Sequence, residues 1–559
     1  MMRNIRFVNL IFIIIAFPLV ISAIGIDVPA TDPVYDFLKR LETRGIIKGF
    51  NDLTLPLTRD EIINFLQIAS QKADELSAIE KKFLHEFLAD YRYETERQLT
   101  EPDSISIPFY QKNYFRQATA NLFSRQDAVE ENHLLMYESG ETFFWFDIGA
   151  RGRMDWKENH QKQMFSDRYL LRGALGKSLT FHTYFARFMK NDNPAFPEPY
   201  EEEIGNFSMV QPSGTVTFDL LQTSLVFHQK YFNIGLYRQP VAWGASGTNN
   251  LILSKSAPLF SYIGFDTQFK GIKLSMIHGS LLNDSTHYRD IAFQQRNRSK
   301  YIAAHRLDIP FFRGTTTVGF SEMVIYGDRG IDIAYMTPFG FYWPIGHALE
   351  DRDNTLMAVD FKTTFIKNIT FYGSVLIDEM RFSELGKQWW ANKHALQAGM
   401  RWSPNIATLP FDFQAEFTAV RPWTYSHKTL TTNYTHNSIC LGFPYGANSQ
   451  TWYFKIGTAL SRRLTLTSEY LILKKGVDDS THFWGGDATV SYELRDEQYD
   501  HATKWLMGDI QTTNQLKVAG RYEIFNDFFI KAGINLYNTK LNNDQESYRF
   551  GFIETEINF

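Results

Sequence analysis

From Glu141 to the C-terminus, apolar and polar residues alternate with a period of two. Residues 411–418, for example, read Phe-Asp-Phe-Gln-Ala-Glu-Phe-Thr, and the same pattern recurs at 144–151, 357–363 and 528–535. Such strands have one apolar face and one charged face. So many strands with a wide apolar face do not fit a soluble sandwich. They predict a mainly β chain that forms a transmembrane antiparallel β-barrel.

The connections between the expected strands alternate between short and long, as in barrels with tight periplasmic turns and extended outer loops. Short turns are expected at Lys177, Asn233, Lys270-Gly271, Lys367-Asn368, Ser461-Arg462 and Asn526-Asp527. Long loops are expected near 190–213, 240–259, 282–299, 327–354, 380–393, 422–449 and 474–510. Counting segments predicts about 18 strands of roughly 10 residues each. An even number places both ends of the barrel on the periplasmic side.

The final strand, Tyr548 to Phe559, is expected to close the barrel. Ile553, Ile557 and the terminal Phe559 share one face, while glutamates occupy the other. An abrupt aromatic end resembles the signal by which the barrel-insertion machinery recognises its clients. We therefore expect outer-membrane lipid and this machinery as partners.

The N-terminal residues resemble a signal for export. Two arginines precede an apolar run that ends at Ser22-Ala23, which is typical of a secretory signal peptide. The protein is therefore expected in the bacterial outer membrane. The predicted division is a signal peptide (1–23), a periplasmic helical domain (24–100), a connector (101–140) and the barrel (141–559).

Three helices are predicted in the periplasmic domain. Asp32 can cap a helix that starts at Pro33, and Thr58–Glu61 and Ser77–Glu80 are capping boxes. The order of helix, Gly-Ile-Ile-Lys-Gly and Pro-Leu-Thr-Arg-Asp-Glu resembles one S-layer-homology-like repeat, a module that binds cell-wall polysaccharide in some proteins. The simpler interpretation is a cap packed against the barrel mouth.

Composition and motifs give no indication of an enzyme. No HExxH spacing connects the histidines and no GxSxG motif occurs. Asp351–Asn354 offers oxygen ligands but lacks the glycine and glutamate of a calcium loop, so a solvated loop is the simpler interpretation. Cys440 is the single cysteine, and a net charge of −5 does not indicate nucleic-acid binding. We predict no catalytic residues, cofactor or metal. A hydrolase with a Ser–His pair assembled in space is a third hypothesis.

Four groups of segments across residues 230–450 carry a resemblance to a known family. They are Leu236–Gly244 with Asn250–Ser254 and Ala257–Phe260; His305–Leu307 with Glu322–Tyr326; Ala334–Phe339 with Asp353-Asn354 and Asp360-Phe361; and Arg421–His427 with Tyr434–His436 and Leu441–Gly446. Their order and spacing are similar to the Wzi-type capsule assembly family of outer-membrane proteins. The resemblance implies a barrel with a periplasmic helical bundle. It also implies a non-catalytic, lectin-like factor for attachment or assembly of exported polysaccharide, such as capsule or exopolysaccharide.

Aromatic and hydrogen-bonding residues in the long loops are the candidates for binding this polysaccharide. Aromatic rings stack on sugar rings, and amide or guanidinium groups bond the hydroxyls. Trp389, Trp390 and Trp484 also lie in long loops. The alternative is an interfacial aromatic girdle. The candidates are Arg238, Trp243, Asn250, Trp343, Asn354, Arg421, Trp423, Tyr425, His436, Tyr445 and Asn448.

The charged faces of the strands leave two functions open. Inside a plugged barrel these side chains would pair with one another, because unpaired buried charges are costly. In a general porin for small solutes they would line water. The residues expected in the lumen are Asp147, Arg151, Asp360, Arg401, Glu416, Glu469, Lys517 and Arg521.

Overall fold

The computed structural model describes residues 25–91, 133–139, 141–191, 215–246, 249–283 and 298–558, with 106–107, 124, 196 and 209–210 between them. The predicted signal peptide, most of the connector and Phe559 lie outside the described residues. Among the residues that are described, no helix is long and apolar enough to cross a membrane.

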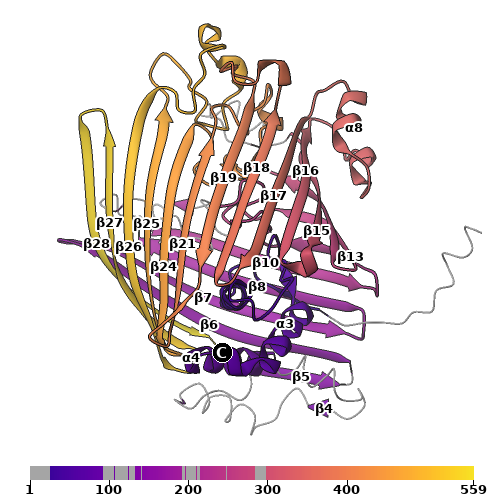
Figure 1. Cartoon of the computed structure of the whole chain (residues 1–559), viewed down its shortest axis with the longest axis vertical. Coiled ribbons are helices and arrows are strands. Elements are labelled where there is room, and N and C mark those ends of the chain that lie inside the picture. Colours follow the sequence, from indigo (N-terminus) through magenta and orange to yellow (C-terminus); the bar gives the residue numbers. More distant parts are fainter. Residues whose placement is uncertain are drawn as a thin grey trace, which may run out of the picture.

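Eighteen antiparallel strands form a closed barrel within the described part of the chain, as the sequence predicts (Figure 1). They are β6 (Thr142–Lys157), β7 (His160–Leu175), β8 (Leu179–Asn191), β10 (Thr215–His228), β11 (Phe232–Arg238), β13 (Ser261–Phe269), β14 (Ile272–Leu281), β15 (Lys300–Phe311), β16 (Thr316–Gly327), β17 (Asn354–Ile366), β18 (Ile369–Glu379), β19 (Lys393–Trp402), β21 (Leu409–Val420), β24 (Ser449–Ser461), β25 (Leu464–Val477), β26 (Asp509–Phe525), β27 (Phe528–Leu541) and β28 (Asp544–Asn558). Short strands β4 (Ser106–Ile107), β5 (Leu135–Ser139), β9 (Met209–Val210) and β20 (Asn405–Ile406) pair at its margins.

The last strand closes the barrel. β28 pairs with β27 along its length and with β6 from Gly551↔Trp156 to Asn558↔Gly149. The end of β28 lies at the same end of the barrel as the N-terminal helices (Figure 1). This arrangement agrees with the even strand count.

The apolar faces of the strands point outward and the charged faces point inward. On β17, Asp360 is 0% exposed while its neighbour Phe361 is 43% exposed. On β28, Glu554 is buried and Ile553 is exposed. The structure therefore gives the orientation that the alternation alone leaves open.

Short and long connections alternate from β7 to β27, but the β6–β7 and β27–β28 connections at the long-loop end are also only two residues long, and two turns are displaced from the predicted positions. Asn233 lies inside β11, so the turn before it comprises residues 229–231, and Ser461 is the last residue of β24. The turn residues in the sequence therefore identify the correct connections, but their positions differ from the observed turns by one or more residues.

The N-terminal domain contains the three expected helices, α2 (Pro33–Thr43), α3 (Arg59–Gln71) and α4 (Ala78–Asp90), and both capping boxes form. It lies at the short-turn end of the barrel (Figure 1). Arg40 donates to the carbonyl of Phe411 at 2.6 Å, and Glu86 pairs with Arg462 at 2.7 Å. These contacts hold the helices against the strand turns. The remaining small strands are β1 (Asp27–Val28), β2 (Thr54–Leu55), β3 (Leu57–Thr58), β12 (Ala242–Trp243), β22 (Thr435–His436) and β23 (Ile439–Cys440).

Residues 50–55 of this domain enter the lumen. Lys362 of β17 contacts the carboxylates of Glu42 at 2.7 Å and Asp52 at 2.5 Å. Deeper in the barrel, Arg306 donates to Thr54 at 2.8 Å. Strand β2 then pairs with β12, which belongs to the long loop between β11 and β13. The helical domain and a long loop therefore meet inside the barrel.

Candidate functional site

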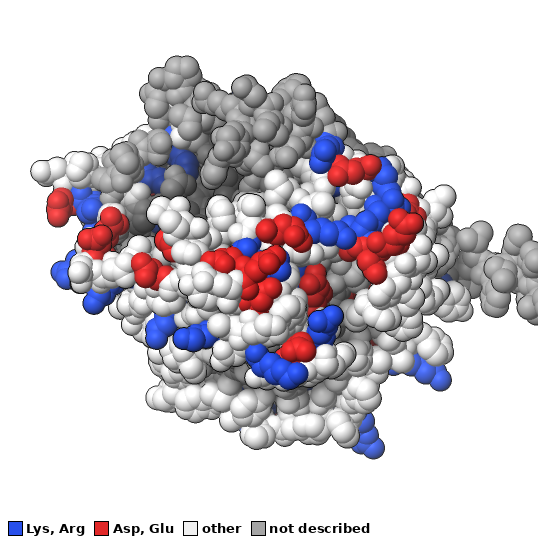
Figure 2. Space-filling view, turned by 90° about the horizontal axis from the view of Figure 1, so that it is seen from above, with Lys and Arg blue, Asp and Glu red and all other residues white. Residues whose placement is uncertain are grey.

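The long loops lie at the end of the barrel opposite the helices (Figure 1), and Figure 2 views this end directly. Acidic and basic side chains mix on this face, with acidic side chains gathered near its middle (Figure 2).

Two of the long loops fold into the lumen instead of covering the surface: 421–448, and the described residues 239–246 and 249–260. Tyr425 donates to the carbonyl of Leu251 and Tyr434 to that of Ile252, each at 2.8 Å. All four side chains are buried in one cluster with lumen-facing residues of β15 and β16. The aromatic residues of these loops therefore form part of the core.

The burial of the sequence candidates follows from this folding. Arg238 and Tyr445 are half-buried, and Trp343 is exposed but lies on the outside of the barrel wall. The structure does not bring the set together on one accessible surface. The buried candidates are Trp243, Asn250, Asn354, Arg421, Trp423, Tyr425, His436 and Asn448.

Several buried candidates instead hold the loop 478–508 in place. Asn448 donates to the carbonyls of Trp484 at 3.1 Å and Met507 at 3.0 Å. Arg421 donates to the carbonyls of Trp389 and Thr503, both at 3.2 Å. These residues position the loop that reaches the surface.

Trp423 and Tyr425 both adopt a positive φ, of 65° and 78°. For bulky residues this conformation costs of order 1–3 kcal/mol each, so surrounding contacts must enforce it. The backbone N–H of Trp423 donates to Gly485 at 2.9 Å, and that of Tyr425 donates to Asp378 at 2.7 Å. A Cβ at Gly485 would come within 2.6 Å of the Trp423 nitrogen. The glycine therefore permits this close approach.

The two buried histidines of the loop 421–448 are neutral near pH 7. Burial lowers the pKa of His436 to about 4. Burial, together with Lys393 and Lys428, lowers the pKa of His427 to about 2. The ring of His436 bonds the backbone at both nitrogens, to the Leu259 carbonyl at 3.1 Å and the Leu282 N–H at 2.9 Å. These contacts give His436 a structural role.

The loops 380–392 and 478–508 carry accessible aromatic residues whose rings contact one another. Trp389 lies 4.6 Å from His501, and Trp484 stacks on His482 at 5.1 Å and contacts Tyr499 at 5.0 Å, all between ring centroids. We call these five residues, each half-buried or exposed, the outer aromatic surface. The sequence marked its tryptophans as loop residues but gave no signal that their ring partners were Tyr499, His482 and His501.

Polar groups surround the outer aromatic surface. The indole N–H of Trp484 donates to Asp479 at 3.0 Å, and Arg495 pairs with Asp500 at 2.9 Å. Hydrogen bonds from Thr481 hold the pKa of Asp479 well below its usual range. The loop thus presents ring faces beside carboxylates and a guanidinium. The acidic residues of 478–508 are Asp478, Asp479, Asp487, Glu493, Asp496, Glu497 and Asp500, against Arg495 and Lys504.

The segment Asp351–Asn354 does not gather its oxygens around one point. Asp351 lies 2.9 Å from His347, whereas Asp353 pairs with Arg329 at 2.7 Å and accepts from Tyr335 at 2.9 Å. Among the described residues, no group of three His, Cys, Asp or Glu side chains could hold a metal ion.

The predicted lumen residues lie on the inward faces of their strands. Asp147 contacts His133, Arg151 pairs with Glu554 at 2.7 Å, and Asp360 pairs with Arg306 at 2.7 Å. Glu416 accepts from Tyr372 at 2.8 Å. The other four, Arg401, Glu469, Lys517 and Arg521, alternate with exposed apolar neighbours on their strands.

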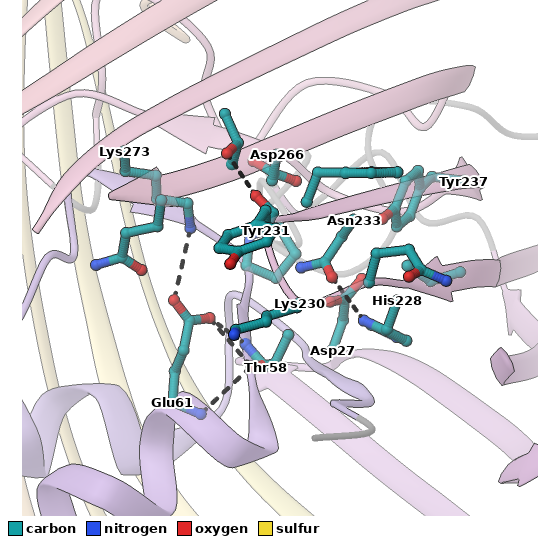
Figure 3. A pocket seen from close by; sticks show the side chains of 16 residues that line it. Asp27, Thr58, Glu61, His228, Lys230, Tyr231, Asn233, Tyr237, Asp266 and Lys273 are labelled. Atoms are coloured by element: carbon teal, nitrogen blue, oxygen red, sulfur yellow. Dashed lines mark hydrogen bonds and ion pairs between the residues drawn. The ribbon is translucent and has the colours of Figure 1, made fainter. Parts of the chain in front are cut away.

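A second polar site lies at the short-turn end, between α3 and strands β10 to β14 (Figure 3). It is a cavity of about 140 Å³ lined by Asp27, Glu61, Asp266 and Lys273, among others. Lys273 lies 3.9 Å from Glu61, and burial raises the pKa of Asp27 to about 7. A cavity of this volume has room for several ordered waters or one small molecule.

Comparison with known proteins identifies a family. The model of the family described as capsule assembly protein Wzi matches residues 154–548. A search of curated proteins found no match.

Among solved structures, the chain is similar to Wzi of Escherichia coli, described as an outer membrane protein involved in group 1 capsule assembly and a carbohydrate-binding β-barrel. The two share 12% identity over 95% of this chain and 99% of the other, with a TM-score of 0.58. OpdK with vanillate and OprD, both of Pseudomonas aeruginosa, share 6% and 8% identity over 74% of this chain and 98% and 95% of theirs. Their TM-scores of 0.43 and 0.40 are too low to inform function.

Proposed function

The chain belongs to the capsule assembly protein Wzi family, and we propose that it attaches or assembles exported polysaccharide at the cell surface without catalysing a reaction. The similar barrel of Escherichia coli is described as an outer membrane, carbohydrate-binding protein, which supports this proposal. The outward apolar faces fit a lipid bilayer. We place the barrel in the outer membrane, the helical domain in the periplasm and the long loops outside the cell.

We propose that the outer aromatic surface contacts the polysaccharide. One observation carries this assignment: accessible aromatic rings lie beside polar side chains. The loops that bear them are held in place by buried hydrogen bonds. Trp389 and Trp484 offer faces for stacking, the Asp479 carboxylate lies beside Trp484, and the Arg495 guanidinium lies over the neighbouring Trp390 ring. Rigid rings lose little entropy on binding, so they suit recognition of a flexible chain.

The porin alternative receives less support. Segment 50–55 and residues 239–246 and 249–260 lie in the lumen and are joined by the β2–β12 pairing. Lys362, Glu42 and Asp52 also pair there instead of lining an aqueous path. We therefore assign these charged side chains the role of holding segment 50–55 in the lumen. We also propose that a signal peptide directs export and that the barrel-insertion machinery recognises the C-terminal strand.

Substitution of the two accessible tryptophans tests the proposed binding surface. Trp389→Ala with Trp484→Ala should lower retention of surface polysaccharide on cells, while the heat-modifiable folded band stays normal. Trp402→Ala is the matched control, because Trp402 is exposed on the outer wall of β19, at the short-turn end. Unchanged retention by a folded double variant would refute the assignment of this surface.

The sequence candidates Trp243 and Trp423 give a contrasting test. Both are buried, so Trp243→Ala and Trp423→Ala should lower retention only together with a loss of loop protection against proteases. Lost retention with fully protected loops would instead indicate direct sugar contacts by these two residues.

A further inference from the structure

The long connection between β16 and β17 lies outside the barrel wall. It contains a 3₁₀ turn, η4 (Ile333–Met336), and helix α8 (Tyr342–Ala348). Figure 1 shows α8 beside β16 on the outer side of the wall. We call residues 331–345 of this connection the collar.

The inner side of the collar packs on the outward face of β15 and β16. Tyr335 and Tyr342 are buried against Ala303, Val324 and Tyr326. The alternating residues of β16, such as Met323 and Ile325, belong instead to the cluster in the lumen. The collar therefore covers the face that is otherwise turned away from the lumen.

The collar also covers a charge on that outward face. The carboxylate of Glu322 accepts from the backbone N–H groups of Tyr342 at 2.7 Å and Trp343 at 2.6 Å, and lies 3.2 Å from the His305 ring. Met357, which pairs with Glu322 across the strands, is 40% exposed on the apolar outer face. A bare carboxylate at this level would face hydrocarbon, which is costly. The collar supplies it with hydrogen bonds.

The outer side of the collar is strongly apolar. Phe339 is 80% exposed, Ile333 78%, Phe341 74% and Trp343 53%. Exposed apolar patches of this kind on a folded protein mark an interaction site. The residues that follow, Glu350 to Arg352, are exposed and charged.

We propose that the collar inserts into the outer leaflet of the membrane and is covered by lipid acyl chains. Its apolar side continues the lipid-facing band of the wall, where Phe320, Met357 and Val359 are exposed on neighbouring strands. Aromatic residues are favoured at the level where acyl chains meet headgroups. The charged residues after α8 then lie toward water. This surface is separate from the outer aromatic surface and does not depend on its function.

Photolabelling of the unmodified protein tests the proposal directly. The full chain would be reconstituted in phosphatidylcholine vesicles that contain a lipid with a photoreactive group on its acyl chain. Trypsin then releases the collar as one peptide, Gly330 to Arg352, because no Lys or Arg lies between them. We expect lipid adducts on this peptide as on the peptide of the exposed β17 wall. Adducts on the wall peptide alone would overturn the proposal.

Spin labels at single cysteines distinguish lipid from a protein partner. In a Cys440→Ser background, labels at Phe339→Cys and Ile333→Cys should collide severalfold more with oxygen than with a water-soluble nickel chelate. A label at Arg352→Cys, the control on the same connection, should show the reverse. Collisions at 339 and 333 that match those at 352 would place the collar in water. Protection from both reagents would indicate a protein surface, and either result overturns the proposal.

Discussion

The contact of Lys362 with Glu42 and Asp52 is expected to hold segment 50–55 of the helical domain in the lumen. Replacement by methionine, Lys362→Met, keeps most of the side-chain volume and removes the cation. Breaking a buried ion pair by removing one partner costs on the order of 3–5 kcal/mol. Lys39 lies 3.7 Å from Asp52 and offsets part of this loss, so we expect the lower end of the range.

A loss of about 3 kcal/mol lowers the ratio of docked to undocked domain roughly a hundredfold. Arg40 and Glu86 still hold the helices to the strand turns, so the segment 50–55 should leave the lumen intermittently. The assay is single-channel recording in planar bilayers, with protease digestion of residues 25–91 in parallel. We expect brief openings and faster cleavage in the variant.

Docking of segment 50–55 is expected to depend on pH through Glu42 and Asp52. Burial raises the pKa of Glu42 to about 7 from 4.5. Its contribution to docking is therefore full below about pH 4.5 and is lost as the pH rises through 7. Although burial opposes it, Lys362 and Lys39 hold the pKa of Asp52 below its usual value, so its contribution is lost only in acid. Without Lys362, protonation is the remaining way to neutralise Glu42. Openings of the variant should thus be frequent at pH 8 and rare at pH 5.

Lys367→Met is the matched control, because Lys367 is an exposed lysine in the turn that follows β17. It should behave as the parent at both values of pH. A Lys362→Met variant that stays closed and protease-resistant at pH 8 would refute the assigned role of this ion pair. Openings that become more frequent in acid would refute the predicted role of Glu42 protonation.

Three further predictions concern the wall, the loops and the C-terminus. Ile553→Arg should lower the free energy of unfolding in vesicles by about 2–4 kcal/mol, and Ile557→Arg by less, because Ile557 is nearer the membrane edge; equal losses would argue against this depth order. Gly485→Ala should displace the loop 478–508 and lower polysaccharide retention with an unchanged heat-modifiable band, since the new Cβ would meet Trp423; normal retention would show that the contact is dispensable. Deletion of Phe559 should lower the yield of folded protein in the outer membrane, and a normal yield would show that the terminal residue is not needed for insertion.

Much of the barrel could be predicted from local patterns. The alternation at 357–363 depends only on which residues share a face of an extended strand, and the structure keeps that face outward. The capping boxes at Thr58 and Ser77 are equally local and form as expected. Whether the apolar face points outward or inward could be decided only from the closed barrel. An extended strand has the same geometry whether its apolar face is covered by lipid or by a protein core.

The positions of the loop residues could not be predicted in the same way. Trp423 and Trp484 both lie in polar loops with glycine nearby, yet the first is buried and the second is partly accessible. An aromatic ring that packs under a loop and one that stacks on a sugar need the same residue type and similar hydrogen-bonding neighbours. What separates them is a contact between distant segments, such as Tyr425 with Leu251 or Asn448 with Met507.

This division between buried and accessible aromatic residues also explains why both kinds occur in the same loops. A flexible loop would lose the advantage of a rigid ring, because ordering it on binding costs conformational entropy. Tyr425 and Asn448 remove that cost before binding, by fixing loops 421–448 and 478–508 to each other and to the lumen. The accessible Trp389 and Trp484 can then meet a polysaccharide as preformed faces. Segment 50–55 also contributes to this order, because β2 pairs with β12 in the same loop that contains Leu251, the hydrogen-bond partner of Tyr425.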